Sequence, residues 1–319
     1  MTKIDLITGF LGSGKTTFIQ KYVDYLLSIH EKIGIIENDY GAINVDMLLL
    51  NDLKKKGVGL EMVSGGCDYD CHRRRFKTKL LTMSLLGYDR VIVEPSGVFD
   101  VDEFFDLLHE EGLDGRYAIG NVLTVVRADL EEDLSDRADY VLGCQIADAG
   151  RIILSFTENT EKEDISKTKA HLRKALDLIS CPKILNDDLF IEKSFDDLDE
   201  DDFKKIVSSS YLETAYVKKY DIDTLGFDSL FYMNPEGENS KILSSIEKIW
   251  KDEGVGNIWR IKGFLKEEDH WLKINSTKTQ TKISPSNIGQ SVLIVIGEDL
   301  DAEKIEVYFP SQYSSLHTQ

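Results

Sequence analysis

The stretch GFLGSGKTT, Gly9 to Thr17, decides how the first half of this chain folds. It fits the pattern G-x-x-x-x-G-K-[ST], follows the apolar run IDLIT and precedes a segment with helical spacing from about Lys15 to Ile29. In that context the glycines let successive backbone N–H groups turn inward around phosphate oxygens. The pattern predicts a phosphate-binding loop whose contacts are Gly9, Gly12, Ser13, Gly14, Lys15, Thr16 and Thr17.

Two side chains of this loop are expected to carry chemistry. Lys15 should reach the β and γ phosphates and act in catalysis, and Thr16 should offer its hydroxyl to Mg²⁺. The motif therefore predicts a nucleoside triphosphate and Mg²⁺ as ligands. The alternative, a chance glycine-rich turn, does not explain the strand before it and the helix after it.

The order of apolar runs along the chain predicts the fold class. Short apolar runs alternate with amphipathic stretches through KIGIIE, RVIVE, NVLTVV and RIILSF, which is typical of a parallel sheet covered by helices. We expect an α/β fold with a doubly wound, mostly parallel sheet in residues 1–215. Residues 216–319 should form a smaller α+β domain, with a frayed tail from Pro310 to Gln319.

The acidic composition argues against nucleic acid and anionic membranes as partners. The 57 Asp and Glu residues against 38 Lys and Arg give a net charge of −19, which repels nucleic acid and anionic membranes. The sequence begins without a basic and apolar leader, and no segment has the apolar length of a membrane span, so we expect a cytoplasmic protein. Its four cysteines indicate thiols or metal ligands rather than a disulfide framework.

The run VIVEPSGV, residues 91–98, is the second signal and resembles a Walker B strand. At the end of a central strand, Glu94 would face the phosphates, where it could order the attacking water or hold Mg²⁺ through a water. Gly97 could give its backbone N–H to the γ phosphate. The alternative is an ordinary strand end with a solvated acid.

Taken in order, these segments resemble the CobW-type branch of the CobW/HypB/UreG family, which are P-loop GTPases linked to metal delivery. The resemblance rests on GFLGSGKTT, ENDYGAINVD, SGGC, VIVEPSG, TVV, QIA, WRIKGF and IGEDL. It implies GTP hydrolysis with Mg²⁺, coupled to delivery of a transition metal or to activation of a metal- or cobalamin-dependent client protein. It names neither the client nor the oligomeric state.

The resemblance also places a metal site beside the nucleotide. The family carries Cys-x-Cys-Cys after its glycine pair, whereas this chain reads GGCDYDCHRRR and keeps Cys67 and Cys71. Glu37 and His72 would complete the ligand set, with zinc as the default metal. Asp39 stands where the family has Glu in its switch segment and is expected near Mg²⁺ or the nucleotide. Structural thiols, in a nucleotide-dependent switch without metal cargo, remain the alternative.

The base-recognition segment is a second departure from the family. Where relatives carry Asn-Lys-x-Asp after an apolar strand, this chain has Ser155-Phe156-Thr157-Glu158. Glu158 could accept hydrogen bonds from guanine N1 and N2, and Phe156 could cover the base. The resemblance favours GTP, and a P-loop enzyme that uses ATP remains the alternative.

Overall fold

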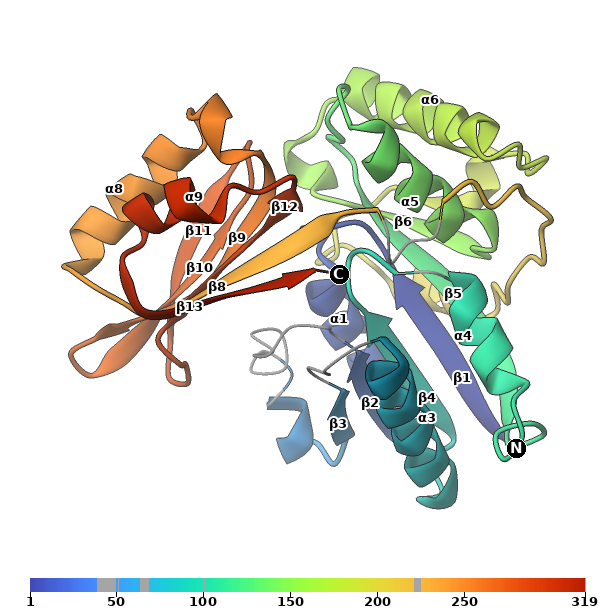
Figure 1. Ribbon diagram of the computed structural model, residues 1–319. Coiled ribbons are helices and arrows are strands. Elements are labelled where there is room, and N and C mark those ends of the chain that lie inside the picture. Colours follow the sequence, from blue (N-terminus) through green and yellow to red (C-terminus); the bar gives the residue numbers. More distant parts are fainter. Residues whose placement is uncertain (39–49, 51, 64–68, 100, 221–224, 319) are drawn as a thin grey trace. The chain divides into compact units, whose positions relative to one another are not determined.

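The computed structural model (Figure 1) describes residues 1–38, 50, 52–63, 69–99, 101–220 and 225–318. A seven-stranded parallel sheet forms the centre of the first unit, in the order β3-β2-β4-β1-β5-β6-β7. The strands are β1 (Thr2–Thr8), β2 (Ile33–Asn38), β3 (Gly59–Val63), β4 (Arg90–Pro95), β5 (Tyr117–Arg127), β6 (Arg151–Ser155) and β7 (Phe190–Ile191).

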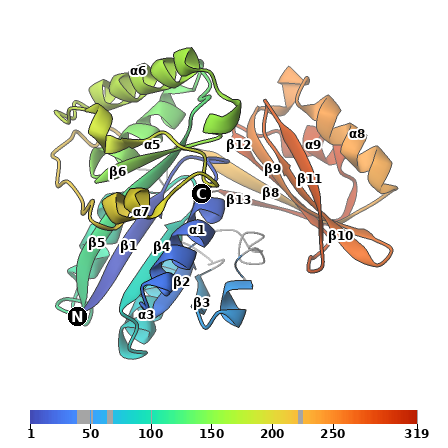
Figure 2. The ribbon, with the colours of Figure 1, turned by 180° about the vertical axis from the view of Figure 1, so that it is seen from behind.

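Helices cover both faces of this sheet. Figure 1 shows α3 (Tyr69–Leu85) and α4 (Val101–Leu108) on one face, and the reverse view in Figure 2 shows α1 (Lys15–Ser28) and α7 (Glu200–Val207) on the other. Neighbouring residues of β1 point to opposite faces, so Leu6 packs with the α3 and α4 side and Ile7 with the α1 and α7 side. Helices α5 (Asp136–Ala147) and α6 (Lys162–Leu178) pack together, and the expected doubly wound α/β domain is confirmed.

The strand order decides where the site residues gather. Because all seven strands run parallel, their carboxyl ends lie at one edge of the sheet. Strands β4 and β2 end on one side of the loop that follows β1, and strands β5, β6 and β7 end on the other side. A ligand held at the end of β1 can therefore be contacted from both directions.

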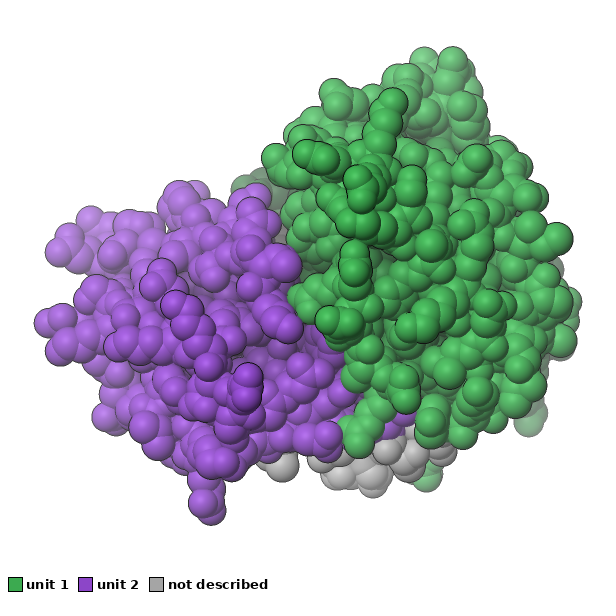
Figure 3. All heavy atoms as spheres, turned by 90° about the horizontal axis from the view of Figure 1, so that it is seen from above, with its two compact units in different colours: residues 1–40, 49–222 green, residues 41–48, 223–319 purple. Residues whose placement is uncertain are grey.

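The described part of the second unit, residues 225–318 (purple in Figure 3), is built on an antiparallel sheet of six strands in the order β11-β10-β9-β12-β8-β13. Its apolar core lies between that sheet and two helices. The expected α+β class is confirmed, and the predicted boundary between residues 215 and 216 stays a prediction. The elements are β8 (Phe227–Pro235), α8 (Asn239–Ile249), β9 (Asn257–Glu267), β10 (His270–Ser276), β11 (Thr281–Ser286), β12 (Val292–Glu298), α9 (Ala302–Tyr308) and β13 (Ser311–Thr318).

The expectation of a frayed tail was wrong. Residues 311–318 form β13, which pairs antiparallel with β8. The physical reason is that β8 would otherwise end the sheet with a row of unpaired backbone N–H and C=O groups. In the described part of the chain, no helix has both the length and the apolar content that a bilayer crossing requires.

Candidate nucleotide-binding site

The loop between β1 and α1 has the shape that its glycines predict. Gly9 has a φ of 147°, and a Cβ atom there would lie 2.3 Å from the carbonyl oxygen of Val125, so no other residue fits without moving the backbone. The side chain of Lys15 folds back and donates from Nζ to the carbonyl oxygen of Gly9, at 2.7 Å. Within the described residues, the buried hydroxyl of Ser13 has no hydrogen-bond partner. Thr17, in the first turn of α1, is exposed.

The two motifs of the sequence meet at the end of β4. The Oγ1 atom of Thr16 donates to Oε1 of Glu94 over 2.8 Å, although 78 residues separate them. Both side chains are buried, and Glu94 lies beside Glu37 in the register of β4 and β2. A hydroxyl and carboxylates in a buried setting are the hard oxygen donors that Mg²⁺ prefers, so the residues present fit that ion.

The turn after β4 packs directly on the phosphate-binding loop. A Cβ atom on Gly97 would lie 2.5 Å from Cδ2 of Leu11 and 2.9 Å from its backbone nitrogen. The same turn is held from α5, where Nε2 of Gln145 donates to the carbonyl oxygen of Gly97 at 3.0 Å. The carbonyl oxygen of Gln145 accepts in turn from the hydroxyl of Thr124 on β5, at 2.6 Å. A change at the turn after β4 is thus linked to the phosphate loop and to α5.

The predicted metal ligands are only partly within the described residues. Cys67 lies outside them, as does Asp39, which was expected near Mg²⁺ or the nucleotide, and Cys71 and His72 lie in the first turn of α3. Nε2 of His72 makes a 2.8 Å hydrogen bond with Oδ1 of Asn38, the last residue of β2, so this nitrogen already has a partner. Among the residues that are described, no group of three or more His, Cys, Asp or Glu side chains could hold a metal ion.

The predicted base segment follows β6 and carries an unusual backbone. Phe156 has a φ of 60°, in the left-handed region that residues with a side chain seldom adopt. The guanidinium carbon of Arg127 lies 4.2 Å from the centre of its ring. Glu158, on the 3₁₀ turn Thr157–Asn159, is exposed, and its Oε1 accepts from the amide of Asn159 at 3.4 Å.

A known protein family matches more than half of this chain. Residues 3–180 match the family described as CobW/HypB/UreG, nucleotide-binding domain. The chain belongs to this family. The resemblance drawn from the motifs is thereby confirmed.

Two curated relatives of this CobW/HypB/UreG protein come from Escherichia coli (strain K12). It is 29% identical over 164 residues to the zinc chaperone YeiR, covering 51% of this chain and 49% of that protein. It is 27% identical over 165 residues to the zinc chaperone YjiA, covering 49% of each. The chain thus spans about half the length of the curated relatives it matches. The solved structure of Zn(II)-bound YjiA GTPase from E. coli aligns over 96% of this chain and 97% of that one, with 18% identity and a TM-score of 0.33.

The motifs do not reveal three residues that lie against Gly97, Phe156 or Gly14 in this CobW/HypB/UreG domain. Gln145 falls within the QIA segment, but nothing in the sequence says that its amide reaches Gly97, 48 residues away. Arg127 follows the apolar run NVLTVV and looks like an ordinary strand end. Phe195 follows β7, whose two residues are too short a run to reveal a strand.

Proposed function

We propose that this chain is a Mg²⁺-dependent P-loop GTPase that couples its nucleotide state to delivery of a transition metal, with zinc as the cargo, to a client protein. The observation that carries the proposal is the hydrogen bond between Thr16 and Glu94 beside the buried Lys15. It joins a phosphate-binding loop to an acid at the end of a neighbouring strand, an arrangement suited to phosphoryl transfer. Family membership supports the nucleotide, and the names of the relatives YeiR and YjiA support zinc.

The mechanism assigns each step to a side chain of the site. Lys15 exchanges the carbonyl oxygen of Gly9 for the β and γ phosphates, because a phosphate oxygen is a stronger acceptor for an ammonium group. Thr16 and Glu94 would hold Mg²⁺, directly or through water, and the ion when bound neutralises charge on the leaving phosphoryl group. Glu94 accepts a hydrogen bond from the attacking water and orients it. The N–H of Gly97 donates to the γ phosphate, which makes the turn after β4 sensitive to its loss.

A short path of contacts supports coupling to a metal cargo. Glu94 and Glu37 are partners in the register of β4 and β2, and the next residue of β2, Asn38, is hydrogen bonded to His72. His72 adjoins Cys71 at the start of α3. Movement at the end of β4 could therefore reach the thiol without a long relay. We propose Glu37, Cys67, Cys71 and His72 as the cargo ligands, with His72 using Nδ1 or giving up its bond to Asn38.

The coupling is tested by measuring Zn²⁺ affinity with a non-hydrolysable GTP analogue and with GDP. We expect tighter Zn²⁺ binding in one nucleotide state, and equal affinities would refute the coupling. The double variant Cys67→Ser, Cys71→Ser should lose Zn²⁺ binding and keep GTP binding. The matched control is Cys144→Ser, since Cys144 is a buried thiol of α5 that is not among the proposed cargo ligands.

A nucleotide-dependent switch without metal cargo is the second candidate. It is favoured by one observation, that the described residues contain no cluster of three metal ligands. Under this function, wild type and the double cysteine variant would bind Zn²⁺ equally weakly and would bind the client alike. Calorimetric competition between GTP and ATP then tests the expected preference for GTP, which we assign to Glu158.

A further inference from the structure

Two phenylalanine rings, from the segments that follow β6 and β7, converge on the start of α1. A Cβ atom on Gly14, the residue before that helix, would lie 3.5 Å from Cε2 of Phe195, 3.7 Å from Cβ of Ser155 and 3.9 Å from Cε2 of Phe156. Both rings are half-buried and so have surface left to contact a ligand. Two aromatic edges thus lie beside the end of the phosphate-binding loop, on the side where β6 and β7 end.

A cation–π contact with Arg127 holds the ring of Phe156 in place. The guanidinium group of Arg127 lies over its ring at 4.2 Å, a distance at which a cation attracts the electron-rich face. Arg127 is itself fixed by two hydrogen bonds to the carboxylate of Asp129, from Nε at 3.0 Å and from Nη2 at 2.8 Å. Since one face of Phe156 is covered by Arg127, the rest of the ring remains for a ligand.

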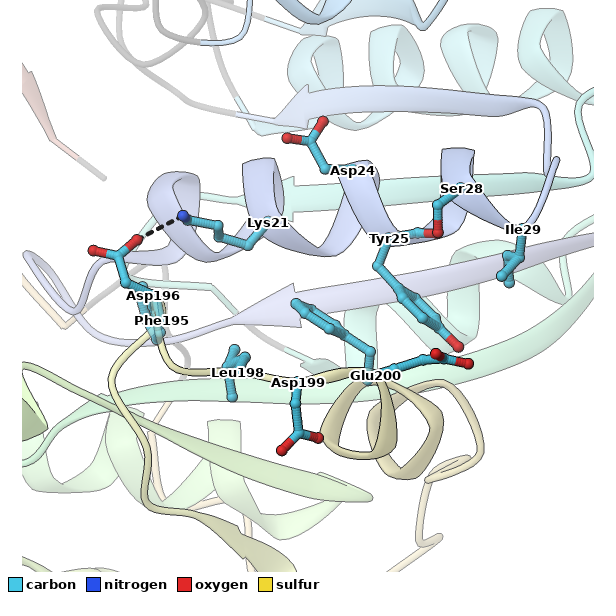
Figure 4. Close-up of a pocket in the computed structure, with 11 residues that line it drawn as sticks. Lys21, Asp24, Tyr25, Ser28, Ile29, Phe195, Asp196, Leu198, Asp199 and Glu200 are labelled. Carbon is cyan, nitrogen blue, oxygen red and sulfur yellow. Dashed lines mark hydrogen bonds and ion pairs between the residues drawn. The ribbon is translucent and has the colours of Figure 1, made fainter.

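Residues of α1 hold Phe195 and its neighbour in place. Its ring packs against Phe18 of α1 with centroids 5.7 Å apart. The next residue, Asp196, pairs with Lys21 of α1 at 2.6 Å, as the dashed line in Figure 4 marks. The pocket drawn there, of about 560 Å³, lies along α1 beside Phe195, and none of its lining residues belongs to the phosphate-binding loop. The pair with Lys21 and the packing on Phe18 therefore anchor the loop that carries Phe195.

The strand order indicates which end of a bound nucleotide would lie near Phe156 and Phe195. Glu94 and Glu37 lie next to the last residues of β4 and β2, on one side of β1, and this is the side assigned to the γ phosphate. Phe156 and Phe195 follow β6 and β7 on the other side. A triphosphate held by the loop with its γ phosphate toward Glu94 must extend its ribose and base toward the two rings.

We propose that Phe156 and Phe195 hold the purine ring of the nucleotide by aromatic contact, and that Arg127 is a positioning residue for Phe156. This inference rests on the proposed nucleotide binding and adds its mode of base recognition. Stacking on a ring face does not distinguish guanine from adenine, since every base has such a face. Affinity for the base then comes from the two rings, and the exposed Glu158 can act only at the edge of the base.

The test compares three probes bound in magnesium buffer: GTP, ATP and inorganic tripolyphosphate. We expect Phe156→Ala and Phe195→Ala each to lower the affinity for GTP and for ATP by the same factor, about tenfold. The affinity for tripolyphosphate should stay unchanged. Phe156→Tyr should keep the wild-type affinity for GTP and ATP, whereas Phe156→Leu should lose affinity as Phe156→Ala does. Phe105→Ala, a half-buried phenylalanine on α4, is the matched control and should change none of the three affinities.

The outcomes separate the two proposals. Unchanged nucleotide affinity in both alanine variants, or an equal loss for tripolyphosphate, overturns the aromatic site. Lys15→Ala should weaken all three probes, and its failure to do so would overturn the phosphate-binding loop instead. A double-mutant cycle tests the role of Arg127. Arg127→Ala should lower the affinity for GTP in the wild-type background and should have no effect on it in the Phe156→Ala background. Additive losses would refute the positioning role.

Discussion

Replacing Gly97 by alanine probes the contact between the turn after β4 and the phosphate-binding loop. The added Cβ atom would lie 2.5 Å from Cδ2, 2.9 Å from Cγ and 2.9 Å from the backbone nitrogen of Leu11. Gly97 is not among the residues with positive φ, so the effect of the new methyl group is steric. Overpacking of this kind costs about 1–3 kcal/mol, and reduced backbone freedom in the unfolded chain returns about 0.4–1 kcal/mol.

We therefore expect Gly97→Ala to lower the free energy of unfolding by roughly 1–2 kcal/mol. If the phosphate-binding loop moves to relieve the contact, the affinity for Mg²⁺-GTP falls as well. Urea unfolding and calorimetric titration measure the two effects.

The double variant with Leu11→Ala sharpens this test. Shortening Leu11 removes the contacts to its Cδ2 and Cγ atoms but keeps the contact to its backbone nitrogen. A double-mutant cycle should then show favourable coupling with incomplete rescue. If Gly97→Ala changes stability by less than about 0.5 kcal/mol and leaves GTP affinity unchanged, the close contact between the turn and the loop is refuted.

Three further predictions concern neighbouring groups. Gln145→Leu leaves the carbonyl of Gly97 without its donor and should lower the free energy of unfolding by about 1–3 kcal/mol in urea titrations; no change would show the bond to be dispensable. Glu94→Gln keeps an acceptor for the hydroxyl of Thr16 but loses the charge that orients water. GTP hydrolysis should fall about a hundredfold or more while GTP binding persists, and full activity would exclude the assigned role. Burial raises the pKa of Asp148 to about 6, so its carboxyl binds protons more tightly in the folded state and its contribution to stability falls as pH rises from about 4 to about 6. Asp148→Asn should lose that dependence, gaining up to about 3 kcal/mol on the wild type across this range, and parallel stability curves would contradict it.

The parts of the fold that the sequence predicted are those specified locally. The phosphate-binding loop could be read because strand, glycines and helix are continuous in the chain. The placement of Glu94 beside the phosphate-binding loop follows from the sheet, since β4 pairs parallel with β1, but the hydrogen bond between Thr16 and Glu94 was not predicted. The regular spacing of apolar residues likewise predicted the bounds of α1 closely.

The parts that were missed depend on packing between distant segments. Phe195 reaches the start of α1 only because β7 adds a two-residue strand beside β6, and two residues carry no periodicity. Gln145 belongs to a helix whose buried residues run all round it, so its amide could not be told from a core position. The tail was wrongly expected to fray because β13 forms by pairing with the edge of β8, and no local sequence pattern predicts that pairing.

The proposed function requires that Lys15 and the loop around it bind the triphosphate. Equilibrium titration of Mg²⁺-GTP into the wild type and into Lys15→Ala tests it most directly. Losing charge-assisted contacts to two phosphates should weaken binding about a hundredfold. The same affinity in both proteins, or no binding by the wild type, would contradict the account.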